Sequence, residues 1–93
     1  MVVGVLRLDI YIPQSQSLKA KRQIIKGLKD KLRRRFNVSI CELADQDLWQ
    51  RATLGVASLS TESSYVYLIL SRVESSLGDE GRIQILHSSI ELR

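Results

Sequence analysis

The chain has 93 residues, enough for one domain over residues 1–93 and too few for a second hydrophobic core. With 44% apolar and 26% charged residues, its composition is that of an ordinary globular protein. The single cysteine, Cys41, excludes an intramolecular disulfide, and with a single histidine it cannot form a Cys/His zinc site. The N-terminus does not resemble a signal peptide, and no apolar run approaches the roughly 20 residues that span a bilayer. We therefore expect a cytoplasmic domain without a membrane partner.

Positive charge is concentrated in the first part of the chain. Residues 1–36 contain ten Lys/Arg and two Asp/Glu, whereas residues 37–93 contain four Lys/Arg and eight Asp/Glu. This asymmetry indicates a surface that faces a polyanion. The alternative is a solvated helix face that only aids solubility.

The first predicted element is a strand over residues 2–12. Leu6, Leu8 and Ile10 alternate with Arg7 and Asp9, which is the period of a strand with one buried face. Pro13 ends the strand because it has no N–H group for the ladder.

A helix is predicted over residues 18–35, with Ser17 as its N-cap and Asn37 as a left-handed C-terminal cap. One arc of this helix is apolar, as expected for a helix that packs on a sheet. Ala20 and Gly27 lie beside Ile24 and are small enough to let a second helix approach. The apolar residues are Leu18, Ile24, Ile25, Leu28, Leu32 and Phe36.

The remaining elements complete a β-α-β-β-α-β order. Strands are expected at residues 38–43, 52–59 and 82–92, and the last of them should contain a bulge after Ile85. A second helix is expected at residues 62–77, with Ser60 or Thr61 as its N-cap. Two split βαβ units with right-handed crossovers give an α+β, ferredoxin-like sandwich. Its four-stranded antiparallel sheet carries both helices on one face and leaves the other face open.

The first helix carries a row of cations beside its apolar arc. Like charges at these spacings repel, and the N-terminal ones also face the positive end of the helix dipole. A nucleic-acid backbone would supply the missing counter-charge, so the row predicts contacts with RNA or a ribosome-like RNA surface. Solvation alone, or an acidic protein partner, is the alternative. The candidate nucleic-acid-binding residues are Lys19, Arg22, Lys26, Lys29, Arg33, Arg34 and Arg35.

The open sheet face and the loop before the third strand offer two further surfaces. Tyr11 is the only aromatic residue expected on the open face, so base stacking there is not predicted. Its small apolar residues, Val3, Val5, Gly55 and Ala57, instead suit a homodimer. In the loop, Trp49 and Arg51 form a candidate partner-binding site, although a lone tryptophan at a strand start more often covers the core.

No catalytic constellation is evident, and we expect neither an enzyme nor a cofactor. Cys41 and His87 lie in different strands with nothing to bring them together, and Asp45 and Asp47 have the spacing of a turn. The loop after the first strand contains no glycine, unlike the anion loop of acylphosphatases, which share this topology. Ser17 and the amides that follow it could still hold one phosphate of a nucleic acid.

Four strings of this chain are distinctive: GVLR at 4–7, SLKAKR at 17–22, RFNVS at 35–39 and QDLWQRATLGVA at 46–57. They resemble the bacterial YlxP-like family, whose function is unknown. The resemblance is strong over about residues 1–60, and only the pattern agrees beyond them. It implies a ferredoxin-like fold and a genomic setting among translation-initiation and ribosome-maturation genes, but no catalytic residues. The family has a charged residue in many members where this chain has Ala20.

Overall fold

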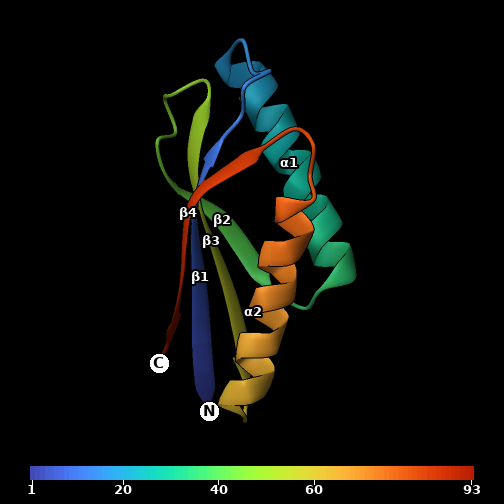
Figure 1. Ribbon diagram of the computed structural model, residues 1–93, viewed down its shortest axis with the longest axis vertical. Helices are drawn as coiled ribbons and strands as arrows, with labels where there is room; N and C mark the ends of the chain where they lie inside the picture. The colour runs from blue at the N-terminus through green and yellow to red at the C-terminus, as the bar shows by residue number, and fades with distance from the viewer.

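The computed structural model describes all residues 1–93 and contains the predicted order of elements (Figure 1). Each predicted bound lies within two residues of the observed one. The molecule is elongated, 42 Å along its longest axis, and the strands run along that axis. The elements are β1 (Val2–Tyr11), α1 (Leu18–Arg35), β2 (Ser39–Ala44), β3 (Arg51–Ser60), α2 (Ser63–Gly78) and β4 (Gln84–Leu92).

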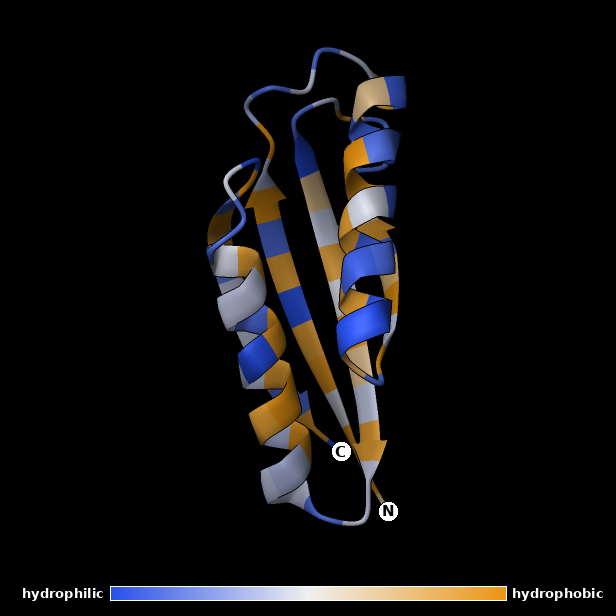
Figure 2. Ribbon diagram, turned by 90° about the vertical axis from the view of Figure 1, so that its right-hand side faces the viewer, coloured by the Kyte–Doolittle hydropathy of each residue, from blue (hydrophilic) through white to orange (hydrophobic).

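The strand order is β2-β3-β1-β4, and each neighbouring pair is antiparallel. Figure 2 shows α1 and α2 side by side on one face of the sheet. The predicted ferredoxin-like α+β fold is therefore confirmed. No helix is both long and apolar enough to cross a membrane.

The core lies between the sheet and the two helices. Leu6 and Leu8 of β1 point into it, and Leu8 pairs across the ladder with Leu54 of β3. Leu28 of α1 and Leu70 of α2 cover these strand residues from the helix side. This burial of alternate strand residues explains why the period of two in residues 2–12 located β1.

The ends of the helices agree with the predictions only in part. Ser17 caps α1 as predicted, since its Oγ accepts a hydrogen bond from the amide of Ala20 at 3.0 Å. The predicted left-handed cap at Asn37 is wrong: α1 ends at Phe36 in extended conformation, and the only non-glycine residue with positive φ is Asp45. Neither Ser60 nor Thr61 caps α2, which begins after Glu62 without a side-chain cap.

Two further expectations concern backbone irregularities. The predicted bulge in the last strand is confirmed, because the β1–β4 register shifts between the pairs Asp9–His87 and Ile10–Ile85. The expected helix contact at Gly27 is wrong, since a Cβ atom there would meet no atom within 4 Å. The small residue of α1 faces open space because α2 packs against β1, β3 and β4 and not against this side of α1.

Candidate nucleic-acid interface

The cations of α1 form one continuous band, which we call the basic stripe and define as Lys19, Arg22, Lys26, Lys29 and Arg33. Spacings of three and four residues place all of them on the same side of the helix. Lys29 is half-buried and the other four are exposed. Arg34 and Arg35 extend the positive charge around the last turn, where the helix dipole favours cations.

None of the basic-stripe residues takes part in an ion pair. The four ion pairs of the molecule join Lys21 to Glu42, Lys31 and Arg82 to Glu80, and Arg93 to Glu91. The first turn of α1 also lacks an acidic residue that would offset the helix dipole near Lys19. The five cations of the stripe therefore have no ion-pair partner, and Asp30 is the only acidic residue of α1 beside them.

On the opposite side of α1, Lys31 pairs with Glu80 in the turn that follows α2. Lys31 Nζ lies 3.7 Å from a Glu80 carboxylate oxygen, and Arg82 Nε donates to the same carboxylate at 3.0 Å. That hydrogen bond, with the positive charges of Arg82 and Lys31, holds the pKa of Glu80 below its usual value. Because Lys31 is paired in this way, the unpaired positive charge of α1 lies on the stripe and in the last turn.

The basic stripe lies along the free edge of the sheet. Strand β2 is an edge strand, and the guanidinium of Arg33 donates to the carbonyl of Ile40 in that strand at 3.1 Å. The stripe and β2 therefore form one surface on the side of the molecule away from α2.

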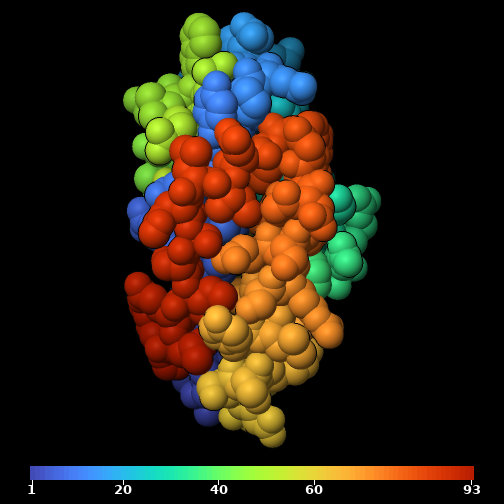
Figure 3. Space-filling model, in the orientation of Figure 1, coloured from blue at the N-terminus to red at the C-terminus, as the bar shows by residue number.

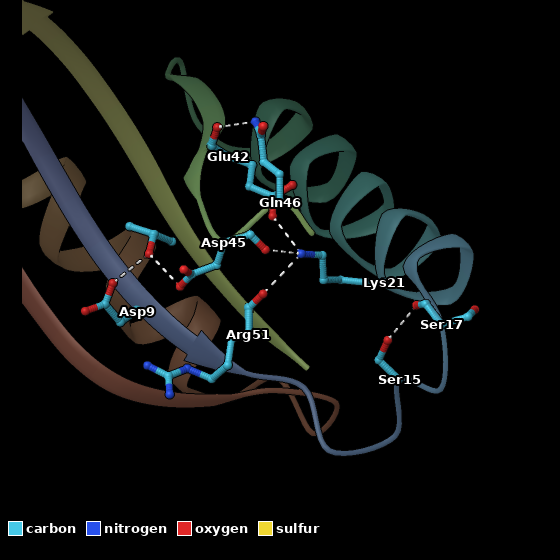
Figure 4. A network of polar contacts seen from close by, with 9 residues as sticks. Asp9, Ser15, Ser17, Lys21, Glu42, Asp45, Gln46 and Arg51 are labelled. Atoms are coloured by element: carbon cyan, nitrogen blue, oxygen red, sulfur yellow. Dashed lines mark hydrogen bonds and ion pairs between the residues drawn. The ribbon is translucent and has the colours of Figure 1, made fainter. Parts of the chain in front are cut away.

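Lys21 belongs to α1 but points inward and is fully buried (Figure 4). Its Nζ donates to the carbonyl oxygens of Asp45 at 2.6 Å and Arg51 at 3.1 Å, and lies 3.0 Å from Glu42 Oε2. The Glu42 contact has the distance of an ion pair without the alignment of a hydrogen bond. A buried ammonium needs such partners, because an unpaired one would be far too costly.

This network ties α1 to the connection between β2 and β3. Asp45 adopts a left-handed conformation with φ of 64°, and its carbonyl also accepts from the amide of Leu48 at 3.1 Å. The predicted turn at Asp45 and Asp47 is therefore present. Lys21 fixes both ends of the segment that carries Trp49, since it binds the carbonyls of Asp45 before it and Arg51 after it.

Trp49 does not cover the core. Trp49 is 57% exposed, so the interpretation that a lone tryptophan at a strand start covers the core is wrong here. Trp49 is instead an exposed aromatic residue. The side chain of Arg51 is also exposed and forms no ion pair. The two residues lie at the end of the molecule where the connection meets the loop after β1, with Gln50 Nε2 donating to the carbonyl of Pro13 at 3.1 Å.

The open sheet face is only partly as expected. Val3 pairs with Leu59 and Val5 with Ala57, and all four side chains lie on the face away from the helices. Gly55 is not available on that face, since the side chain of Leu43 lies over it. Leu59 is 61% exposed and extends the apolar surface beyond the residues that the sequence indicated.

A groove of about 550 Å³ between the C-terminal end of α1 and α2 was not predicted. It brings Arg35, a residue of the predicted interface, close to Tyr65 and Arg72 of α2. Spacings of i, i+4 and i+7 put Tyr65, Ile69 and Arg72 on one side of α2, and this is the sequence signal that could have revealed the groove. No group of three His, Cys, Asp or Glu side chains is placed to hold a metal ion.

The fold and this surface define the class: a ferredoxin-like α+β domain whose first helix carries nine cations and one acidic residue, Asp30. The chain belongs to the family described as "Protein of unknown function (DUF503)", whose model matches residues 3–90. It is 35% identical over 72 residues to the uncharacterized protein YlxP of Bacillus subtilis (strain 168), covering 77% of this chain and 78% of that protein. The resemblance to the YlxP-like family is therefore confirmed.

Two designed proteins are similar in structure. The de novo designed protein LFR1 1, which has a ferredoxin fold, gives a TM-score of 0.51 at 15% identity and covers 100% of this chain and 84% of that one. The de novo designed protein Foldit4 gives a TM-score of 0.47 at 15% identity, covering 99% of this chain and 92% of that one. The likeness to LFR1 1 supports the fold and nothing further.

Proposed function

We propose that this domain is a non-catalytic, cytoplasmic RNA-binding module that holds the phosphate backbone of RNA, free or in the ribosome, on the basic stripe. The observation that carries the proposal is that all five stripe residues lack an ion-pair partner, while Lys31 on the opposite side of α1 has one. An evolved solvent-facing helix usually mixes charges of both signs. A helix in which only Asp30 offsets this repulsion is suited to a polyanion.

The dimensions of the stripe suit a nucleic-acid strand. From Lys19 to Arg33 the helix rises about 21 Å, at about 1.5 Å per residue, with one cation on each turn. A strand laid along it meets several positive charges in succession. These side chains contact phosphates and not base edges, so the stripe confers affinity without sequence preference.

We expect the affinity for ribosomal subunits and for a structured RNA to fall steeply with salt. If about four phosphates are engaged, binding weakens about a hundredfold between 50 and 200 mM salt, because each contact releases condensed counterions. The Arg22→Glu/Lys26→Glu variant, which changes two exposed residues of the stripe, should lose at least tenfold in affinity and about two units of the salt slope. Fluorescence anisotropy across a salt series measures both quantities.

The matched control is Arg82→Glu/Arg93→Glu, which makes the same change in net charge at exposed residues outside the stripe. Its RNA affinity should stay within threefold (about 0.7 kcal/mol) of the unmodified protein, because long-range charge is screened over about 10 Å. Equal losses in the two variants would mean that net charge and not the stripe drives binding. Absence of binding even at low salt would refute the proposal.

A second candidate function is a homodimer that pairs the open sheet faces of two copies. The observation that favours it is the exposure of Leu43, 46%, and Leu59, 61%, beside Val3 and Ala57 on that face. We expect a dimer by sedimentation at high micromolar concentration and a monomer for Leu59→Lys, whose charge would be desolvated in the interface. A monomer for the unmodified protein at that concentration excludes this candidate.

A further inference from the structure

The groove between the two helices combines charge with aromatic surface. Arg35 and Phe36 at the end of α1 form one wall, and Tyr65 and Arg72 of α2 form the other. Figure 3 shows this end of α1 (green) beside α2 (orange) on the outside of the molecule. Its volume of about 550 Å³ is within the range of roughly 300–1,000 Å³ that is usual for small-molecule sites.

The two arginines are available to an anion. The guanidinium of Arg35 lies 5.4 Å from the centre of the Phe36 ring and donates to Ser76 Oγ at 3.4 Å, which holds it over the groove. Only one of its five N–H donors is used in this way. Arg72 is exposed and has neither an ion pair nor a side-chain hydrogen bond. Asp79 is the only acidic residue of the lining, so positive charge is in excess.

The other side chains of the lining distinguish a nucleotide from a simple anion. Tyr65 is 52% exposed and contributes an aromatic ring to the lining, and bases stack on aromatic rings whatever their sequence. The amide of Asn37, which also lines the groove, can both donate to and accept from the edge of a base. An acidic peptide would use the arginines but would leave the aromatic surface and the amide without a partner.

We propose that this groove binds one unpaired nucleotide of an RNA, with its phosphate between Arg35 and Arg72 and its base on Tyr65. The inference rests on the proposed RNA-binding function and deepens it. The basic stripe holds the backbone of any RNA, and the groove selects RNA in which a nucleotide is bulged or single-stranded. Arg34 and Arg35 in the last turn of α1 connect the two surfaces.

The test compares two RNA duplexes that differ only by one bulged adenosine, which adds a single phosphate to the paired duplex. The unmodified protein should bind the bulged RNA about tenfold more tightly, which is the effect of one stacked base. Tyr65→Ala and Arg72→Gln change exposed residues and should abolish this preference while keeping the affinity for the paired duplex. Tyr67→Ala removes another exposed tyrosine of α2 that does not line the groove, and it should keep the preference.

A titration with adenosine 5′-monophosphate, followed by NMR, separates this inference from the function of the stripe. We expect shifts at the Tyr65 ring and at the amides of Ser75 and Ser76, both in the unmodified protein and in Arg22→Glu/Lys26→Glu. Such shifts without binding of either duplex would support nucleotide binding in the groove and refute RNA binding by the basic stripe. Equal affinity for the two duplexes, or a preference that survives Tyr65→Ala, would overturn the inference even if the stripe binds RNA.

Discussion

Replacement of Lys21 by methionine is expected to lower the free energy of unfolding by about 3 kcal/mol, although methionine fills nearly the same space. Lys21 is fully buried, and its removal leaves the Glu42 carboxylate and two carbonyls without their partner. Breaking a buried ion pair costs about 3–5 kcal/mol. We take the lower end because the Glu42 side chain is 16% exposed and water can partly replace the ammonium.

Chemical denaturation measures this loss, which corresponds to a fall of roughly 15 °C in Tm for a domain of this size. Amide exchange should show faster opening at Leu48, since its hydrogen bond to Asp45 lies inside the segment that Lys21 fixes. The matched control is Lys31→Met, whose ion pair with Glu80 is 3.7 Å long and half exposed. That substitution should change stability by less than about 1 kcal/mol, as exposed pairs do.

The double variant Lys21→Met/Glu42→Leu separates the ion pair from the two carbonyl hydrogen bonds. Removing both charges together avoids an unpaired buried carboxylate, so the double variant should be more stable than Lys21→Met alone. What remains lost is the hydrogen bonding of the Asp45 and Arg51 carbonyls. A single variant within 1 kcal/mol (about fivefold in the folding equilibrium) of the unmodified protein would show that the network carries little stability.

The fold could be predicted because each helix and strand has a recognisable pattern of apolar residues within its own segment of the sequence. Apolar and polar residues alternate in residues 2–12, and residues 18–35 have an apolar arc; each pattern indicates an element buried on one face. The order of the elements is then compatible with only a few topologies. The helix ends were less predictable. Asparagine often adopts the left-handed conformation at a helix C-terminus, which is why Asn37 was predicted as a cap. The chain instead passes directly from Phe36 into an extended segment that leads to β2. Where a connection is this short, the position of the next strand decides its conformation.

The candidate site could be predicted only where it depends on one helix. The basic stripe follows from spacing within α1 alone. Lys21 is not part of the row of cations and is in phase with Ile25, Leu28 and Leu32, all buried, yet its burial was not predicted. Its partners lie 24 and 30 residues away, so no local pattern identifies them. The groove likewise could not be predicted, because it forms only where Arg35 of α1 lies close to Tyr65 and Arg72 of α2.

Gly4 shows how a strand can determine the position of a helix. It lies in β1 on the face toward α2, where a Cβ atom would collide with the side chain of Val66 and lie 2.8 Å from Leu70 Cδ1. Both neighbours are completely buried and cannot move into solvent. The absence of a side chain therefore lets α2 approach the sheet closely, as glycine in a strand often does. The groove depends on this position, because α2 carries Tyr65 and Arg72.

Gly4→Ala is therefore expected to destabilise the domain by about 2–3 kcal/mol, the cost of overpacking a filled core. Gly55→Ala is the matched control in the same sheet. Its Cβ atom would meet Leu43 Cδ1 at 2.8 Å, but Leu43 is 46% exposed and can swing away, so a change below about 1 kcal/mol is expected. Denaturation curves of the two variants measure the difference. Equal stabilities would mean that α2 can retreat from β1 at no cost, and that Gly4 does not set the position of the groove.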